Sequence, residues 1–505
     1  MLKSKTDFSD VLYRVRFLYV LVFTVFTALN KFIFFQFVNA SFIALTYSAL
    51  AACGVLLLVL DFFTKRNMFR TSYNGIMLLF FVVYVISMIV NIRYGWVDNA
   101  KTLVWMLIQT FLLFAADIDQ PLESHLKQLR IVAECFIFIW FIGTVISFGQ
   151  FLVQYADVRQ IPGDNNCIQG FAVGRLFGEF TDPNVASVCS MIAVVLTAFI
   201  MYQFKPRALL KVYYIITIVF NAIYIILSGS RTGMLIVAAS IFASAVLLFS
   251  LKFSEMGIRR LYKSCFTVIC AILCTVIVVG GMNLAKTGLS YVPKIVEPIT
   301  DGVETALGLE FHKDDDSDIS DQIDMTRPDI EGNSDISNAR FKIWTDSLRL
   351  VEKSPVFGTS ARNHLMFAQD YFGEDMYIVT RQYSVHNGYL SLLVYTGIIG
   401  TLIIACWLVL TVKKVLGYLI RRRHDRDEYY MPIAFLTLIA MVIGISAFPM
   451  MGIFFGNSII ELLFWLLLGY LFCFIRKSEP NVNEPLTYRI AENIKSKLCR
   501  KNKEA

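Results

Sequence analysis

Charged residues are scarce in this chain of 505 residues: Asp, Glu, Lys and Arg account for 17% of it, against 56% hydrophobic residues. Soluble proteins carry about 25% charged residues, so the deficit argues against a soluble globular domain. The aromatic share is 14%, and Phe alone contributes 43 residues. Such a composition is typical of a polytopic membrane protein, for which lipid is the solvent.

Motifs that would indicate a metal, nucleotide or disulfide-rich protein are also missing. The sequence has no HExxH zinc motif, no CxxC pair and no GxxxxGKS/T phosphate loop. The acidic run at 314–318 lacks the glycine and the closing glutamate of an EF-hand. Most of the ten cysteines lie in apolar segments, which does not suggest a disulfide framework. We therefore expect no dedicated metal site and no cofactor.

Long apolar segments, each able to cross the hydrocarbon core as a helix, fill most of the chain. They lie at 12–30, 41–62, 75–92, 101–116, 131–153, 185–204, 208–228, 234–251, 265–284, 388–412, 432–449 and 452–475. Together they predict an all-α polytopic membrane protein with about 12 transmembrane helices. Helices 1–9 would occupy 1–284, a large extracytoplasmic loop 285–387, helices 10–12 would occupy 388–475, and a basic cytoplasmic tail 476–505.

Basic residues are distributed unevenly between the two sides of the predicted bundle. With the N-terminus in the cytoplasm, the inner segments hold 30 of the 46 Lys and Arg, the long loop 10 and the short outer loops 6. The positive-inside rule compares short loops, so this bias predicts that both termini are cytoplasmic. The net charge of +7 then faces anionic lipid headgroups, and we expect no nucleic-acid partner.

The long loop has two parts of different character. Residues 301–335 hold 12 acidic residues and two basic ones, Lys313 and Arg327, which predicts a solvated, mobile insert. From about 337 to 353 apolar residues recur at helical spacing until Ser354-Pro355 ends the run. This predicts an amphipathic helix near the outer membrane boundary that presents Arg340 from its first turn.

The chain has only five histidines, so candidates for a general base can be found by eliminating those predicted to face the cytoplasm. Two of the five histidines fall on the cytoplasmic side, which leaves His312, His364 and His386 for an outer-face substrate. His386 lies where the long loop re-enters the membrane, so a base there could meet both water and a lipid-anchored substrate. The alternative is that His386-Asn387 only caps the tenth span, and the sequence leaves both interpretations open.

A candidate anion site is the short outer turn Ser228-Gly229-Ser230-Arg231-Thr232-Gly233. Its glycines let backbone N–H groups approach a ligand, and the next helix points its N-terminus at the same place. Arg231, beside Ser230, adds a planar charge suited to phosphate. An arginine snorkelling beside a Ser/Thr cap is the alternative. An arginine in so short an outer turn opposes the charge bias, which favours the anion site.

Three other polar residues are candidates for supporting roles. Arg175 and Glu179 flank glycines in an outer segment that ends at Asp182-Pro183-Asn184, a good helix start. Glu179 could be a second base, although a solvated carboxylate of low pKa is the plainer expectation. Glu461 is placed about two helical turns below the outer surface, where it needs a partner or a proton. It could orient an arginine of the site or pair within the bundle.

The order of these motifs resembles that of the O-antigen ligase and Wzy-type polysaccharide polymerase superfamily. The resemblance spans about 174–400, whereas the first five spans and the acidic insert match no pattern of that superfamily. It rests on a long penultimate outer loop and on the motifs Gly229-Ser230-Arg231-Thr232-Gly233, Arg340 before a Trp-containing helix that continues to Ser354-Pro355-Val356-Phe357-Gly358, and Val385-His386-Asn387-Gly388-Tyr389-Leu390.

The resemblance implies a metal-independent glycosyltransferase that acts at the outer face of a bacterial cytoplasmic (inner) membrane. Its partners would be an undecaprenyl-diphosphate-linked oligosaccharide donor, a glycan acceptor and membrane lipids, with a flippase and a chain-length regulator nearby. The implied diphosphate ligands are Arg231 and Arg340, with Arg175 as a further contact, and His386 is the implied general base. Supporting candidates are Glu179, Asn387, Glu461 and Ser230.

Three functions are compatible with this sequence. The first is a polymerase that joins lipid-linked repeat units, with inversion predicted from the mechanism. The second is a ligase that moves finished glycan to lipid A core or to another acceptor. The third is a lipid-linked oligosaccharide flippase or other transporter, which would need ionisable residues along a path through the bundle. The spans carry almost no charge apart from Asp61, Glu134 and Glu461, which disfavours transport.

Overall fold

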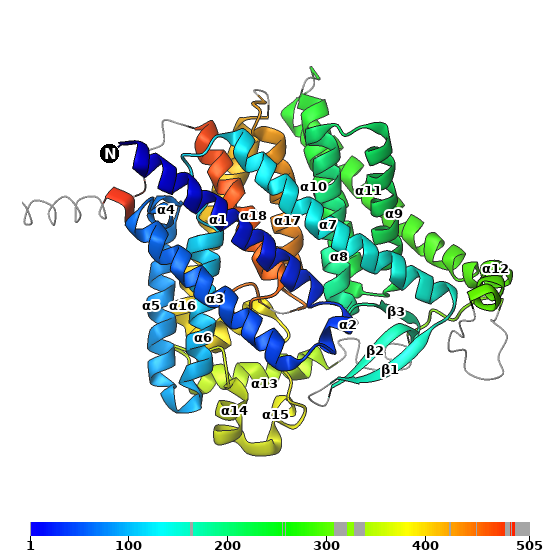
Figure 1. Ribbon diagram of the computed structural model, residues 1–505, viewed down its shortest axis with the longest axis horizontal. Helices are drawn as coiled ribbons and strands as arrows, with labels where there is room; N and C mark the ends of the chain where they lie inside the picture. The colour runs from blue at the N-terminus through cyan, green and yellow to red at the C-terminus, as the bar shows by residue number, and fades with distance from the viewer. Residues whose placement is uncertain are drawn as a thin grey trace, which may run out of the picture.

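The computed structural model describes residues 2–161, 165–254, 256–257, 259–307, 321–327, 339–423, 426–450, 452–479, 485 and 487–489. Within that part of the chain, nine helices are long and apolar enough to cross a membrane, and two shorter apolar helices accompany them. The protein is therefore an all-α polytopic membrane protein, as the apolar segments predict. Figure 1 shows these helices packed side by side.

Each predicted apolar segment overlaps a helix of the bundle. These helices are α1 (Leu2–Leu29), α3 (Ala40–Phe63), α5 (Asn74–Val90), α6 (Trp96–Ile108), α7 (Leu122–Leu152), α8 (Pro183–Phe204), α9 (Ala208–Leu227), α10 (Arg231–Ser254), α11 (Arg260–Leu289), α16 (Gly388–Arg421), α17 (Tyr430–Ser446) and α18 (Ile459–Ser478). The α6 helix continues into a π-helical turn, η2 (Gln109–Leu113). The α18 helix is almost wholly buried, whereas most of α11 is exposed at the edge, where it packs on α10.

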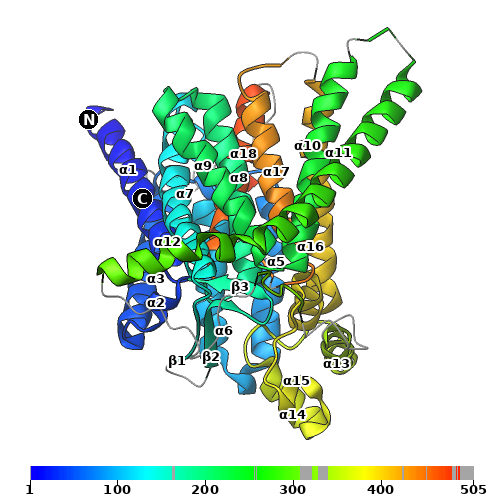
Figure 2. The same cartoon turned by 90° about the vertical axis from the view of Figure 1, so that its right-hand side faces the viewer.

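Shorter elements connect these helices. They are α2 (Ile33–Gln36), α4 (Asn67–Arg70), η1 (Ile92–Tyr94), α12 (Val292–Leu307), α13 (Arg340–Lys353), α14 (His364–Phe372), η3 (Gly373–Asp375) and α15 (Tyr377–Thr380). Figure 2 shows α12–α15 and the strands gathered at one end of the bundle, which we call the long-loop face. The predicted amphipathic helix at 337–353 corresponds in position to α13.

Two predicted boundaries differ from the structure. Helix α11 runs on to Leu289, and α12 then covers Val292–Leu307, so helix extends across the predicted start of the long loop at 285 and into the acidic insert. The last span was expected from 452, but α18 begins at Ile459 because Ser458 caps it. Apolar composition alone could not separate the non-helical approach to this helix from the helix itself.

A small β-sheet forms in the outer segment that ends at Asp182-Pro183-Asn184, where no strand was predicted. Its antiparallel strands are β1 (Ala156–Ile161), β2 (Asn165–Ala172) and β3 (Arg175–Gly178), in the order β1-β2-β3. Ala156 pairs with Gly170, and β2 turns into β3 through Val173 and Gly174, both at positive φ. The bridge between Phe32 and Phe180 ties the end of the sheet to the chain after α1.

The Ser354-Pro355-Val356-Phe357-Gly358 motif packs on a break in α16. The break is at Gly397, which has φ 63° and ψ −167°. The Ile398 N–H donates to the Pro355 carbonyl at 2.8 Å, and the Thr359 N–H donates to the Val394 carbonyl at 2.8 Å. Hydrogen bonds that α16 loses at its break are thus replaced by the segment that follows α13. The motif fixes the end of α13 against α16.

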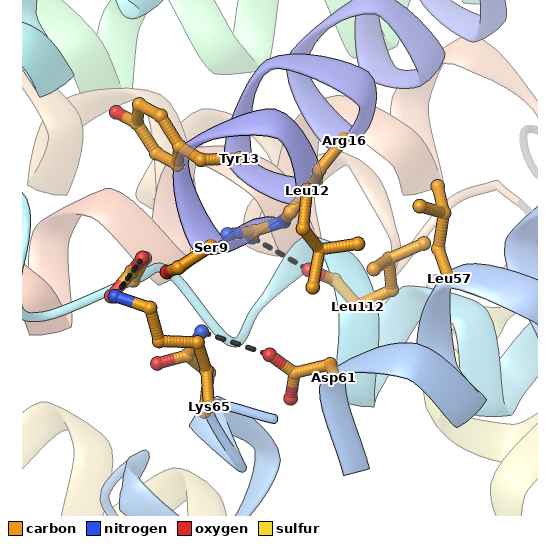
Figure 3. A pocket seen from close by; sticks show the side chains of 10 residues that line it. Ser9, Leu12, Tyr13, Arg16, Leu57, Asp61, Lys65 and Leu112 are labelled. Atoms are coloured by element: carbon orange, nitrogen blue, oxygen red, sulfur yellow. Dashed lines mark hydrogen bonds and ion pairs between the residues drawn. The ribbon is translucent and has the colours of Figure 1, made fainter. Parts of the chain in front are cut away.

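Basic residues gather at the face opposite the long loop. Arg70 pairs with Asp119 at 2.8 Å, and Arg421 pairs with Glu479 at 2.8 Å. Figure 3 shows a polar cluster at the end of α3, where Lys65 pairs with Asp117 at 3.3 Å. Arg421 is the last residue of α16, so its pair with Glu479 lies at the opposite end of that helix from its N-cap, Asn387.

Candidate functional site

The turn between α9 and α10 holds the first candidate residue, Arg231. Gly229 has φ 58°, a left-handed conformation that glycine adopts without steric cost. Ser230 caps α10 by accepting a hydrogen bond from the Gly233 N–H at 3.0 Å. The Ser230 hydroxyl donates to the Asn184 side-chain oxygen at 2.9 Å. Arg231 is the first residue of α10, and its side chain is exposed on the long-loop face.

Arg175 on β3 supports this turn. Its Nε donates to the Ser228 carbonyl at 3.0 Å, and its Nη2 lies 3.4 Å from the Asn184 side-chain oxygen. The guanidinium also stacks over the Phe177 ring, 5.2 Å from its centroid. Arg175 is thus engaged with the backbone of the turn and with Asn184, and it positions the residues beside Arg231.

Arg340 opens α13 and is half-buried. The preceding residue, Ala339, adopts the left-handed conformation with φ 62°. Burial lowers the pKa of the Arg340 guanidinium, and the positive charges of Arg231 and Arg327 lower it further, while Asp182 opposes them. Arg231, Arg327 and Asp182 come from different parts of the chain, and each lies near enough to Arg340 to act on its pKa.

His386 lies directly before α16, whose N-cap is Asn387. The Asn387 side-chain oxygen accepts from the N–H groups of Tyr389 and Leu390, both at 3.0 Å. His386 itself has φ 49°, which is uncommon for a residue other than glycine. Burial lowers the pKa of its imidazole, Arg340 lowers it further, and Asp182 raises it. Asn387 therefore caps α16, as the sequence allowed, and His386 directly precedes this cap near Arg340.

Two of the residues proposed for diphosphate binding and proton transfer, Arg231 and His386, each lie near enough to the third, Arg340, to interact with it electrostatically. Arg231 starts α10, Arg340 starts α13, and His386 precedes α16. Arg340 is the link, because its charge interacts with both of the others. Guanidiniums so arranged can hold an anionic group, and a neutral imidazole beside them can accept a proton.

Glu179 has surroundings that differ from the sequence expectation. It was expected to be solvated, but its side chain is only 8% exposed, below the β-sheet. It accepts hydrogen bonds from the side-chain amides of Gln150 and Gln169. The expectation failed because the sheet that covers Glu179 has no clear signal in the sequence. These contacts hold the sheet to α7 and do not involve an arginine of the site.

Glu461 also has a local partner. It is the third residue of α18 and forms a capping box with Ser458: the Ser458 N–H donates to its carboxylate at 3.0 Å. It therefore lies in the first turn of α18 rather than two turns into the span. Its carboxylate accepts from the backbone N–H and the hydroxyl of Ser458, so it is engaged in capping α18.

The other described histidines are unsuited to act as an accessible base. His364 is 8% exposed against the Tyr395 ring, and burial lowers its pKa to about 4. His125 is buried at the opposite face, with its Nε2 2.8 Å from the Asp117 carbonyl. His312 and His424 lie outside the described residues. His386 is less buried than His364 and His125, and it is the described histidine whose pKa is lowered by Arg340.

Two residues near the site were missed by sequence reasoning. Asp182 was interpreted only as the N-cap of α8, which it is, because it accepts the Asn184 N–H at 2.7 Å. It also interacts electrostatically with Arg340 and His386. Arg327 was noted only as a basic residue within the acidic insert. Nothing local to either residue indicates a contact that forms through tertiary folding.

Comparison with known proteins gives one family match. Residues 216–405 match the family model described as O-antigen ligase. The matched range begins within α9, ends within α16, and includes Arg231, Arg340 and His386. A search of curated proteins finds no match for the chain.

Proposed function

We propose that this chain, which carries a glycosyltransferase domain of the O-antigen ligase and Wzy-type superfamily, is a polysaccharide polymerase. It would transfer glycan from an undecaprenyl-diphosphate-linked donor to a sugar hydroxyl of a second lipid-linked repeat unit. The reaction would take place at the outer face of the cytoplasmic membrane, where the long-loop face would lie. The basic residues gathered at the opposite end of the bundle support this orientation.

The observation that carries the proposal is the position of Arg231, Arg340 and His386 at three separate helix starts, with Arg340 near enough to the other two to interact with both. The leaving group is the lipid diphosphate, which gains negative charge on its bridging oxygen as the glycosidic bond breaks. Guanidiniums fixed at helix starts stabilise that charge without having to reorganise during the reaction. An already activated donor also removes the need for a nucleotide in the transfer step.

His386 would take the proton of the acceptor hydroxyl as the new glycosidic bond forms. Its pKa is lowered by burial and by Arg340, so the imidazole is neutral, and able to accept a proton, at pH 7. Attack from the side opposite the diphosphate would invert the anomeric carbon. The bond between the anomeric carbon and the diphosphate oxygen breaks, and undecaprenyl diphosphate leaves with its electron pair. The proton on His386 would pass to water, which returns the base to its neutral form.

A ligase is the second candidate, and the family description favours it specifically, since the matching model is that of an O-antigen ligase. A ligase would use the same donor chemistry and the same three residues. It would differ in the acceptor, which would be lipid A core or another molecule in place of a lipid-linked repeat unit. A flippase is disfavoured, because the candidate polar residues converge on one face and do not form a path across the bundle.

The deciding experiment gives the purified full-length protein lipid-linked repeat units as sole substrate. A ladder of products supports the polymerase. Products that form only when a different acceptor is added support the ligase. Movement of the lipid-linked substrate across the bilayer with no new glycosidic bond would indicate a transporter. Undiminished glycan transfer by an Arg231→Ala/His386→Ala double variant would contradict both enzyme proposals.

A further inference from the structure

The helix α12 turns an apolar stripe away from the protein. Of the side chains described for this helix, Ile295 and Ile299 are 71% and 68% exposed, and Pro298 is exposed between them. Tyr291, just before the helix, is exposed as well. The spacing of these four residues is i, i+4, i+7 and i+8, which places them on one side of the helix. A helix on the surface of a soluble protein has the opposite arrangement, because its apolar stripe faces the core.

The charged side chains described for α12 are turned further toward the protein. Lys294 and Glu297 form an ion pair at 2.9 Å, and their side chains are 36% and 17% exposed. Both are less exposed than the two isoleucines, although charged residues are normally the most exposed residues of a soluble protein. This inversion indicates that the medium outside the stripe is apolar.

The placement of α12 fits a helix that lies on a membrane surface. Figure 2 shows it at the long-loop face, running across α7 and α9 rather than alongside them, and it packs against α7 and α11. It has 16 residues. At the rise of an α-helix this length is about 24 Å, which is less than the roughly 30 Å of a hydrocarbon core. The helix is thus too short to be a further span and is oriented to lie along the bilayer.

The stripe adjoins a surface that faces lipid. Helix α11 is one of the helices able to cross a membrane, and most of it is exposed. Ile277 and Leu284 on this helix are 70% and 77% exposed. Only Ser290 and Tyr291 separate α11 from α12. The lipid-exposed surface of α11 therefore leads within two residues to the stripe on α12.

We propose that α12 is an interfacial helix, and that its stripe of Tyr291, Ile295, Pro298 and Ile299 is embedded in the phospholipid of the leaflet on the long-loop side. An amphipathic helix that lies along a bilayer buries its apolar face roughly 5–10 Å into the boundary between headgroups and acyl chains. That this leaflet is the outer one rests on the proposed function, whereas the contact with lipid does not.

The acidic insert is a poor alternative cover for the stripe. Residues 314–324 include six aspartates, which would lose hydration against exposed isoleucines. The part of the insert that the structure describes packs elsewhere: the Ile323 N–H donates to the Ser290 carbonyl at 2.9 Å, and the Lys286 ammonium donates to the Met325 carbonyl at 3.0 Å. Ile323 and Met325 are buried, contrary to the expectation of a solvated insert.

The same part of the insert joins the α11–α12 corner to the candidate site. It is bound to Ser290 through Ile323, and the Arg327 Nη1 donates to the Gly229 carbonyl of the α9–α10 turn at 2.8 Å. A helix held in the lipid beside Ser290 would therefore fix the depth of this segment, and of the turn that it contacts, relative to the membrane surface.

The test introduces the photoreactive residue p-benzoylphenylalanine at single positions of the full-length protein in phospholipid nanodiscs. Irradiation joins it to neighbouring C–H bonds, and mass spectrometry identifies the adduct. Ile295 and Ile299 are the test positions, and Ile277 on α11 is the lipid-facing control. Tyr371 is the control for an exposed aromatic residue away from lipid, because it lies on α14, far from the membrane-spanning helices in Figure 2. We expect phospholipid adducts at 295, 299 and 277, and only background at 371.

Three results would overturn the inference, provided that Ile277 yields its lipid adduct. They are an adduct with a peptide of the same chain, an adduct with a second copy of the chain, and the absence of a lipid adduct at both test positions. The first would show that another segment covers the stripe, the second that it is a protein interface, and the third that it faces water.

Ile295→Trp gives an independent measurement if a photoreactive variant does not fold. Its fluorescence beyond that of the six native tryptophans should be quenched by phospholipids brominated in the acyl chains, and little by iodide in the water. The reverse pattern would contradict a position in lipid. A wild-type protein that transfers no glycan would refute the proposed function and leave the lipid contact of α12 standing.

Discussion

Asp182 and His386 stand before two different helices, α8 and α16, and the negative charge of Asp182 raises the pKa of the His386 imidazole. Burial and the nearby Arg340 act in the opposite direction and prevail, so the pKa of His386 lies below its usual value. The protonation state of the proposed base is thus set by residues far away in sequence.

This relationship predicts how acid inhibits the enzyme. A base works when it is neutral, so kcat/KM should fall as the pH drops through the pKa of His386, below about 6.5. Asp182→Asn removes the charge that raises this pKa, and the acid limb should move to lower pH. Asparagine is also a good N-cap, so α8 should keep its start. An acid limb that moves to higher pH, or not at all, would contradict the assignment.

Replacement of His386 should abolish catalysis without unfolding the protein. Because the residue has φ 49°, we choose His386→Asn, since asparagine tolerates this conformation better than most residues. Loss of a general base should lower kcat by a factor of about 10² to 10⁴. The melting temperature and the affinity for undecaprenyl diphosphate should change little. A variant with near wild-type kcat would remove His386 from the mechanism.

Replacement of Arg340 should raise the free energy of the transition state and change the stability of the folded protein little. Arg340→Ala should lower kcat/KM by a factor of about 10² to 10³, as expected for loss of one preorganised charge-stabilising donor group. Arg340→Lys should recover little, because an ammonium lacks the planar fork of donors. Arg159→Ala is the matched control, since Arg159 pairs with Asp157 on β1, away from the turn. Equal losses in Arg340→Ala and Arg159→Ala would refute a specific role.

The break in α16 predicts that a side chain at Gly397, away from the proposed reacting groups, destabilises the protein. A methyl group on Gly397 would lie 2.3 Å from the Val356 carbonyl oxygen, and the residue has φ 63°. Gly397→Ala should therefore lower the free energy of unfolding by about 1–3 kcal/mol. It should also lower activity, because the displaced segment holds the end of α13, which begins with Arg340.

Gly280→Ala in α11 is the control for this effect. Nothing lies within 4 Å of a methyl group at that position, and alanine is the better helix former. Thermal unfolding in detergent should give a melting temperature equal to or above that of wild type for Gly280→Ala, and below it for Gly397→Ala. Equal melting temperatures would show that the break tolerates a side chain.

Much of the architecture is local in origin and could be predicted. A helix that crosses a bilayer needs an unbroken run of apolar residues, so each apolar segment marks a helix without knowledge of the rest of the chain. The helix starts at Asp182-Pro183 and Asn387-Gly388 likewise depend on residues adjacent in sequence. The ends of the helices were harder to predict. The residues before Ile459 are apolar, and apolar composition does not show whether a residue is helical.

The sequence singled out the candidate residues, and the family resemblance implied that they act at one site, but their arrangement in space depends on the tertiary structure. The sequence itself determined which segments are apolar, where their helices are capped, and which arginines and histidines are exceptional for their positions. Only the tertiary structure decided that Arg231 and His386 both lie near Arg340, that Arg327 donates to the Gly229 carbonyl, and that Glu179 is buried beside a sheet. The reason is physical: caps and apolar runs are satisfied by neighbours in the chain, whereas charges from separate helices interact only after those helices have packed.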